Sequence, residues 1–167
     1  MLYKITSTID AINEWIGNSV AWLVSLLVVI TFIVACMRYG FNLGSIAMQE
    51  SIVYLHSIIF MLAIAYTYKH NEHVRVDIFY GNFSAKNKSW VDLLGTLFLL
   101  LPVCAYLVFI SWEYSTKSWA LLEGSPEAGG LPLIFILKTL VPLMPILLAL
   151  QGVATVCRSI TTIKDSE

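Results

Sequence analysis

Charged residues divide this sequence into long apolar stretches. Residues 15–37, 51–68, 93–112 and 139–157 form uncharged stretches of 23, 18, 20 and 19 residues. An α-helix needs about 20 such residues to cross the roughly 30 Å hydrocarbon core of a bilayer. The pattern therefore predicts an all-α integral membrane protein with four transmembrane helices, and we place the spans at about 16–38, 50–68, 91–112 and 138–157.

The N-terminal segment has a different pattern, which is amphipathic. Ile5, Ile9, Ile12 and Ile16 recur every three or four residues, with charged residues on the other side of the turn. This spacing predicts an amphipathic helix that leads into the first span and lies on the membrane surface or against a partner. The segment lacks the basic start, short apolar core and cleavage site of a signal peptide, so we expect it to be retained.

A second amphipathic segment, residues 113–137, separates the third and fourth spans. Its first part, from Tyr114 to Glu123, predicts a short amphipathic helix, and the glycines and Pro126 that follow predict a break. The apolar residues 131–137 are too few to cross a bilayer, so we expect them to lie at the interface before Lys138 begins the last span.

The distribution of cations predicts the orientation of the chain. The side that holds both termini and the loop 69–90 carries seven Lys and Arg residues, and the other side carries three. Cytoplasmic loops are enriched in these residues. Both termini and the loop 69–90 are therefore predicted to be cytoplasmic, and the segment 113–137 to be periplasmic in a bacterial host.

Glu50 and Arg38 stand at the predicted outer ends of the second and first spans. A carboxylate at a helix N-terminus interacts with unpaired N–H groups and the helix dipole, so Glu50 is explained by capping. An ion pair with Arg38 explains it equally well. A third interpretation is a proton-coupled four-span exporter that works through Glu50, although this residue stands at the edge of its span.

His56 is the only ionisable side chain well inside a predicted span. One interpretation is a haem ligand in a membrane anchor subunit, but His70 and His73 lie beyond the cytoplasmic end of the same helix. The favoured interpretation is a neutral histidine bonded to a neighbouring helix. We expect no cofactor and no metal.

The remaining polar residues exclude several function classes. The loop that contains His73, Arg75 and Asp77 combines no nucleophile, acid and oxyanion donors, so we expect no enzyme. The chain has 10 Lys and Arg residues against 11 Asp and Glu residues and lacks a basic run, which excludes nucleic acid as a partner. Lys86 and Lys88 are expected to contact lipid headgroups.

Several motifs together resemble one transporter family. They are Arg38-Tyr39, Glu50, the run from Ala65 to Asp77, the run from Trp119 to Pro126, Gly129-Gly130-Leu-Pro132, Lys138, Pro142, and the run from Leu148 to Gly152. In this order they resemble the small, DctQ-like membrane subunit of tripartite ATP-independent periplasmic (TRAP) transporters over essentially the whole chain. The sequence departs from many members of that family at His56, which replaces an aromatic residue, and at Gln49-Glu50, which replaces paired glutamates.

The resemblance implies a role in the bacterial inner membrane. In such systems a periplasmic binding protein (DctP-like) delivers an organic acid to a large membrane subunit (DctM-like), which imports it with sodium ions. The small subunit packs against the scaffold of the large one and helps to receive the binding protein. It implies no catalytic, substrate-binding or metal-binding residue in this chain.

The candidate structural and partner-contact residues follow from these arguments. Arg38 with Glu50 would tie the outer ends of two spans, and Arg75 with Asp77 would hold the inner loop. The outer segment around Glu123 would contact the binding protein. The full set is Arg38, Glu50, His56, His73, Arg75, Asp77, Glu123, Pro126, Gly130, Lys138 and Gln151.

Overall fold

The computed structural model describes residues 2–74 and 80–165, and these residues are helical with short connections. The elements are α1 (Leu2–Phe41), α2 (Ile46–Lys69), α4 (Ala85–Gly95), the π-helix η1 (Thr96–Leu100), α5 (Leu101–Leu121) and α6 (Ile134–Asp165). Because α4, η1 and α5 follow one another without a gap, the described residues form four rods. Each rod is long and apolar enough to cross a membrane. The predicted fold class is confirmed, and each predicted span lies inside one of these rods.

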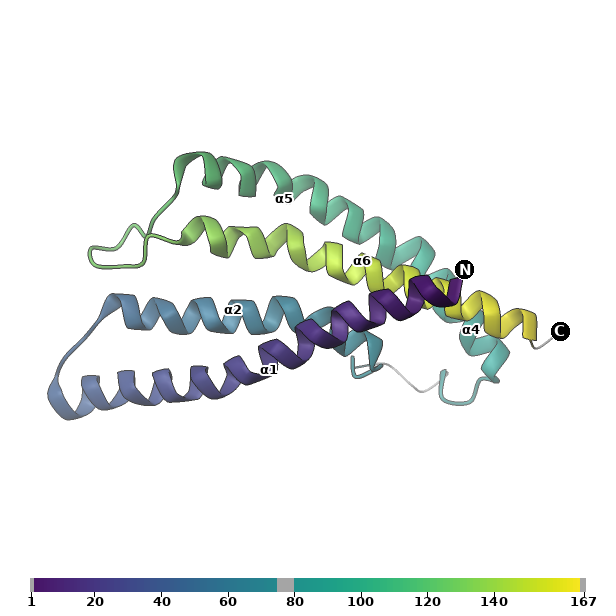
Figure 1. Cartoon of the computed structure of the whole chain (residues 1–167), viewed down its shortest axis with the longest axis horizontal. Helices are drawn as coiled ribbons and strands as arrows, with labels where there is room; N and C mark the ends of the chain where they lie inside the picture. Colours follow the sequence, from purple (N-terminus) through teal and green to yellow (C-terminus); the bar gives the residue numbers. More distant parts are fainter. Residues whose placement is uncertain (1, 75–79, 166–167) are drawn as a thin grey trace.

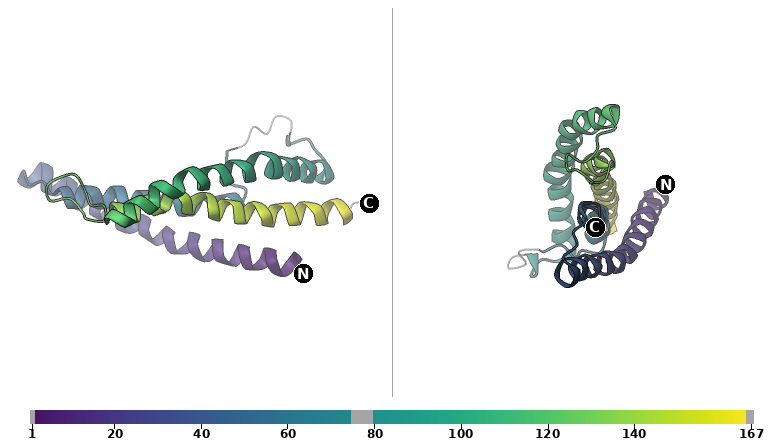
Figure 2. Two further views of the ribbon diagram at one scale, coloured as in Figure 1. Left: turned by 90° about the horizontal axis from the view of Figure 1, so that it is seen from above. Right: turned by 90° about the vertical axis from the view of Figure 1, so that its left-hand side faces the viewer.

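The four rods lie side by side with α6 in a central position (Figure 1). α6 contacts α1, α2, α4, η1 and α5, whereas α1 crosses α2 and approaches α6 near its own N-terminus (Figure 2). Both termini and the described parts of the α2–α4 connection lie at one end of the molecule. The α1–α2 and α5–α6 connections lie at the other end. We call these the inner end and the outer end, after the orientation that the cation count predicts.

The N-terminal amphipathic segment is not a separate helix, because α1 runs without a break through 40 residues. At 1.5 Å per residue this helix is about 60 Å long, roughly twice the thickness of the hydrocarbon core. No proline interrupts residues 2–41, so the N-terminal segment and the first span form one continuous helix, which curves along its length (Figure 2). The amphipathic helix that was predicted to lead into the first span is therefore the N-terminal part of the same helix.

The buried face of this segment also differs from the predicted isoleucine stripe. Ile9 is buried, but Ile5 and Ile12 are 41% and 44% exposed. The side of α1 that faces the other helices combines small, polar and apolar residues, namely Thr6, Ile9, Asn13, Gly17 and Val20. The segment therefore packs on its own bundle through a mixed stripe and leaves part of its isoleucine face uncovered.

α1 and α2 approach each other closely at Gly17. A Cβ atom at this position would lie 2.8 Å from Tyr66 Cβ and closer still to the ring of that tyrosine. The Tyr66 ring also packs against the His70 ring, with ring centroids 4.5 Å apart and planes tilted by 46°. The glycine thus provides the space into which Tyr66 packs.

The third rod contains the irregular turn that Pro102 requires. Proline lacks the N–H that a regular helix uses, and the turn before it, Thr96–Leu100, is a π-helix. This wider turn packs on Gly152 of α6, where a Cβ atom would lie 2.9 Å from Leu100 Cδ2. Further along, α5 buries small residues, namely Cys104, Ser111, Ser115 and Ser118. Small residues let membrane helices approach closely, and here they face α6.

The outer segment also differs from its predicted form. The residues from Tyr114 onward are the last turns of α5, which ends at Leu121, and Lys138 lies inside α6 rather than at its start. Residues 114–123 contain no glycine or proline, so α5 continues to Leu121, and Leu122 takes a left-handed conformation with φ 45°. The non-helical part of the segment is therefore only residues 122–133.

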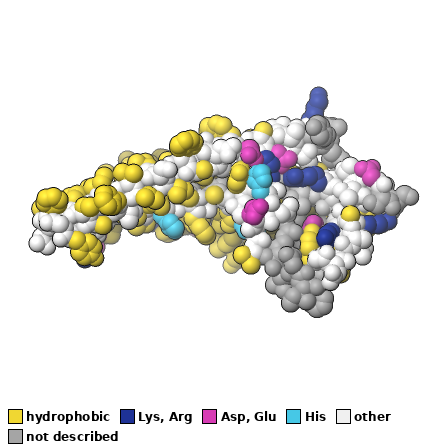
Figure 3. Space-filling model, turned by 90° about the horizontal axis from the view of Figure 1, so that it is seen from below, with side chains coloured by type: hydrophobic (Ala, Val, Ile, Leu, Met, Phe, Trp, Pro, Cys, Tyr) yellow, Lys and Arg dark blue, Asp and Glu magenta, His cyan; other side chains and the backbone are white. Residues whose placement is uncertain are grey.

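On the face shown in Figure 3, charged side chains gather at the inner end. The rest of this face is mostly hydrophobic. This distribution suits a bundle whose long apolar part lies in lipid and whose inner end lies in the headgroup region and the adjoining water.

Substitution of Gly17 by alanine is expected to destabilise the chain by about 1–3 kcal/mol, because the added methyl group overpacks the contact with Tyr66. Thermal unfolding in detergent micelles measures this loss. Gly40→Ala is the matched control, because no atom lies within 4 Å of a Cβ at that position. Equal melting temperatures for the two variants would contradict this account of the α1–α2 contact.

Candidate functional site

Polar side chains that bond to one another form two clusters, one near each end of the bundle. The inner cluster consists of Asp10, Asn13, Glu14, Lys69, His70, Gln151 and Arg158. The outer cluster consists of Glu50, Ser118, Glu123, Ser125, Leu131 and Lys138, with Gly130 packed beside Glu50. The inner cluster joins α1, α2 and α6, and the outer cluster joins α2 and α6 to the loop between α5 and α6.

Gln151 is the buried centre of the inner cluster. Its side chain is 0% exposed, and its Oε1 accepts a hydrogen bond of 2.6 Å from Asn13 Nδ2. Its Nε2 donates to Asp10 Oδ1 at 3.0 Å. A buried amide is costly unless both its donor and its acceptor are paired. Gln151 therefore holds α6 to the N-terminal half of α1.

Ion pairs extend this cluster to α2. Lys69 Nζ lies 2.5 Å from Glu14 Oε2, and His70 Nε2 lies 3.0 Å from the same oxygen. Arg158 Nη2 lies 3.1 Å from Asp10 Oδ1. The inner ends of α1, α2 and α6 are thus joined by one network.

Sequence reasoning identified only Gln151 from the inner cluster. Asp10 and Glu14 were assigned to the polar side of an amphipathic helix, and Lys69 and Arg158 only marked the ends of spans. The sequence does show that charges of opposite sign stand at the predicted inner ends of three spans. It does not show which of these charges form pairs.

Glu50 binds the outer loop, residues 122–133. Leu131 N–H donates to Glu50 Oε2 at 2.6 Å, and the Ser125 hydroxyl donates to Oε1. The cap of α2 is Ser45, whose hydroxyl oxygen accepts from Met48 N–H at 3.4 Å, so Glu50 lies within the helix and is not its cap. None of the ion pairs among the described residues joins Glu50 to Arg38, which is exposed. The structure thus supports neither the capping role nor the Arg38 pair.

Gly130 makes the contact between Glu50 and the outer loop possible. A Cβ atom at this position would lie 2.7 Å from Glu50 Oε1 and 2.6 Å from Ser125 Cβ. The preceding Gly129 has φ 84°, a conformation that glycine adopts without strain. The glycine pair therefore lets the backbone turn sharply and close over the carboxylate.

Glu123 and Lys138 form the second half of the outer cluster. Lys138 Nζ donates to Glu123 Oε2 at 2.5 Å and lies 4.3 Å from the centre of the Tyr114 ring. Ser118 Oγ donates to the same carboxylate oxygen at 2.7 Å. The hydrogen bond from Lys138, and next the one from Ser118, hold the pKa of Glu123 below its ordinary value. This pair holds Glu123, just beyond the end of α5, against the second turn of α6.

The other predicted site residues lie apart from both clusters. Pro126 is exposed at the tip of the outer loop, and His56 is exposed on α2. His73 donates through Nε2 to the Ile64 carbonyl oxygen at 3.3 Å, which folds the chain back after α2. Arg75 and Asp77 lie outside the described residues.

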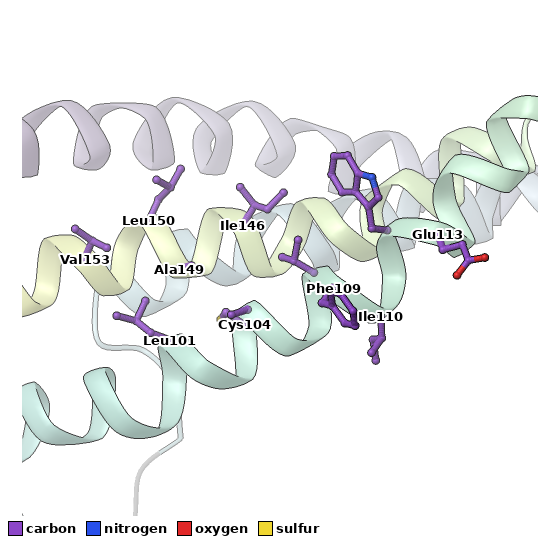
Figure 4. A pocket seen from close by; sticks show the side chains of 12 residues that line it. Leu101, Cys104, Phe109, Ile110, Glu113, Ile146, Ala149, Leu150 and Val153 are labelled. Atoms are coloured by element: carbon purple, nitrogen blue, oxygen red, sulfur yellow. The ribbon is translucent and has the colours of Figure 1, made fainter.

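A wide apolar groove lies between α5 and α6 (Figure 4). Its volume is about 1040 Å³, and Cys104, Phe109 and Leu150 are among the residues that line it. Of the lining residues that the structure describes, only Glu113 is charged, and the Trp112 indole provides an N–H group. The rest of the lining is mostly apolar, which suits hydrocarbon. Among the described residues, no three His, Cys, Asp or Glu side chains are grouped to hold a metal ion.

Replacement of Glu50 by alanine is expected to release the outer loop. Leu131 N–H and the Ser125 hydroxyl lose their shared acceptor, which costs about 1–3 kcal/mol. Limited proteolysis of the loop and thermal unfolding measure the effect. Glu113→Ala is the matched control, because its pair with Lys117 is 72–74% exposed and such pairs contribute about 1 kcal/mol or less. Equal loop cleavage in the two variants would rule out this role of Glu50.

The Glu123–Lys138 pair predicts a pH dependence of stability. Because folding lowers the pKa of Glu123, its contribution is complete above the ordinary glutamate pKa and is lost as pH falls through the lowered value. The difference in melting temperature between the wild type and Glu123→Gln is therefore expected to be constant above about pH 5 and to shrink below about pH 4. Glu127→Gln, in the exposed part of the loop, serves as the control. A difference that grows in acid would have the wrong sign.

Comparison with known proteins agrees with this architecture. The family model described as "Tripartite ATP-independent periplasmic transporters, DctQ component" matches residues 27–162. A Haemophilus influenzae protein named "Putative TRAP transporter small permease protein" is 24% identical to this chain over 131 residues, which cover 76% of this chain and 78% of the relative. No solved structure matches the chain. Because the family match includes α2, α5 and most of α6, this chain belongs to the DctQ component family of TRAP transporters.

Proposed function

We propose that this chain is the small permease subunit that supports the large membrane subunit of a TRAP transporter in sodium-driven, binding-protein-dependent uptake of an organic acid. In this proposal the chain lies in the bacterial inner membrane with both termini in the cytoplasm. It catalyses no reaction and binds no substrate itself. Its proposed role is to keep a constant shape at a constant depth in the membrane.

The observation that carries this proposal is that the carboxylates of the two clusters bond to other groups of the same chain. The two clusters engage Asp10, Glu14, Glu50 and Glu123 in bonds between separate segments of the same chain. These carboxylates therefore serve as acceptors that hold the helices and the outer loop together. A carrier that moves an anion and cations needs polar groups that face its transport path. The arrangement favours a static scaffold.

The exposed hydrophobic surface supports a partner within the membrane. Large apolar side chains are exposed along every rod, for example Trp22 at 80%, Phe109 at 80% and Phe60 at 62%. Lipid covers such surface in a single chain, and a larger membrane subunit covers part of it in a complex. The open side-by-side arrangement of the rods provides broad faces for such packing.

The outer loop is the proposed contact for the binding protein. Its exposed tip, residues 126–129, projects between two fixed points, the Glu50 contact and the Glu123–Lys138 pair. Because Glu123 is engaged with Lys138 and Ser118, we assign docking to the tip rather than to Glu123. At the inner end, we propose that Arg75 and Asp77 hold the loop against the bundle or the large subunit.

The two alternative functions have less support. A proton-coupled exporter needs a carboxylate that gains and loses protons freely, whereas both oxygens of Glu50 accept hydrogen bonds from the outer loop. A haem between two histidines of this chain would need them at one depth. His56 and His70 are 14 residues apart on one helical axis, about 21 Å.

Co-purification tests the proposal for both partners. A tagged chain, co-expressed with the large subunit and the binding protein of its own organism, is expected to retain the large subunit in mild detergent and to capture the binding protein. Glu127→Lys places the opposite charge on the outer tip and is expected to keep the large subunit but to reduce capture of the binding protein. Mass spectrometry of the eluate and binding-protein-dependent uptake measure the two effects.

The control for this variant is Glu72→Lys, the same charge change at an exposed position near the inner end. It is expected to leave the capture of the binding protein unchanged. A tagged chain that purifies alone, or solute transport by the chain reconstituted alone in vesicles, would contradict the scaffold role.

A further inference from the structure

His56 lies at membrane depth on an exposed face of α2. It is six residues beyond Glu50, about 9 Å further along the helix. Its ring stacks on Phe60, with centroids 6.3 Å apart and planes at 14°, and it makes no hydrogen bond to the residues that the structure describes. Ionisable side chains in membranes almost always face protein or water, because contact with lipid is costly. The favoured sequence interpretation, a bond to a neighbouring helix, therefore needs a helix from another chain.

His56 belongs to a continuous exposed face of α2. The face repeats every three or four residues, which is the spacing of one side of a helix. Its apolar members are 39–62% exposed, and Ala65, on the opposite side of α2, is 0% exposed. The face consists of Ile46, Gln49, Val53, His56 and Phe60, and we call it the α2 stripe.

The exposed faces of the neighbouring rods have a different composition. α1 exposes Val28 at 62% and Phe32 at 68%, and its Thr31 hydroxyl donates to the Leu27 carbonyl oxygen at 2.7 Å. α5 exposes Phe109 at 80% and Tyr106 at 62%. Apart from the Tyr106 phenol, the side chains named here suit lipid, because the Thr31 hydroxyl is satisfied on its own backbone. An imidazole at position 56 has no such bond, and Gln49 adds a second polar side chain to the same stripe.

We propose that the α2 stripe is the surface on which one transmembrane helix of the large membrane subunit packs, and that His56 forms a hydrogen bond with a hydroxyl, amide or free carbonyl of that helix. The inference rests on the proposed function, because it takes the large subunit as the partner. The stripe from Ile46 to Phe60 is about 21 Å long, which is enough for one helix contact across most of the hydrocarbon core.

Site-specific photocross-linking tests which surface meets the partner. Benzoylphenylalanine replaces Phe60 on the stripe, or Phe32 or Phe109 on the other two rods, in the complete complex within native membranes. All three positions are exposed phenylalanines, so the probe changes each site in the same way. Irradiation is expected to join the Phe60 variant to the large subunit in higher yield than either control.

Variants of His56 test the hydrogen bond. His56→Leu removes the polar group and is expected to lower retention of the large subunit by about threefold, as a typical hydrogen bond between membrane helices predicts. His56→Gln restores a donor and an acceptor and is expected to recover retention. Tyr106→Phe removes a polar atom from the exposed face of α5 and is expected to have no effect. Melting of the chain alone shows that the variants fold.

The outcomes separate this inference from the proposed function. If the large subunit co-purifies but Phe60 cross-links only to lipid, to a second copy of this chain or to nothing, the α2 stripe is not the interface and the scaffold role stands. Equal retention by His56→Leu and the wild type would refute the role of His56. If no large subunit co-purifies with the wild type, the proposed function fails, and the inference fails with it.

Discussion

The structure depends on how α6 is held among the other helices. Lipid tails are as apolar as leucine, so no hydrophobic force drives helices together within a bilayer, and close packing and polar contacts must do so. α6 provides both. Gly152 admits the π-helical turn, and Gln151, on the neighbouring position, bonds to Asn13 and Asp10 of α1. Gly152 thus contacts the third rod and Gln151 contacts α1. These two adjacent residues of α6 therefore position two different rods against it.

Polar contacts at the two ends complement packing in the middle. At the inner end, Lys69 and Arg158 pair with acids of α1, and at the outer end Glu50 and Lys138 hold the loop that joins α5 to α6. Charges at these positions remain near the headgroups, where their burial costs less than at the bilayer centre. Polar contacts thus hold the bundle together at its two ends, where charge is tolerated. Its middle is held by small residues and aliphatic side chains. A wide, open row of helices can be stable under these conditions.

The sequence predicted what depends on length and local periodicity. Uncharged stretches of about 20 residues located all four rods, because the thickness of lipid sets that length. It also predicted that the amphipathic segment leads into the first span, and because no breaker separates them, the two form the single helix α1. It did not predict the partner of Glu50, which lies 81 residues away at Leu131. Capping and an Arg38 pair were local explanations, whereas the observed contact depends on how α2 and the outer loop meet in space. Gly130 was identified through a family resemblance, and only the structure shows that its missing side chain makes room for the Glu50 carboxylate.

The geometry around Glu50 explains why a carboxylate at the edge of a span can be structural rather than a proton carrier. One oxygen accepts a hydrogen bond from the Leu131 backbone N–H, which can act only as a donor. The other oxygen accepts a hydrogen bond from the Ser125 hydroxyl. A proton on Oε2 would place a donor against the Leu131 N–H, and a proton on Oε1 would require the Ser125 hydroxyl to turn and become the acceptor. A transport cycle through Glu50 would therefore rearrange these contacts at every turnover. A scaffold has the opposite requirement, because the surface that it presents to its partners has to keep its position while another subunit moves.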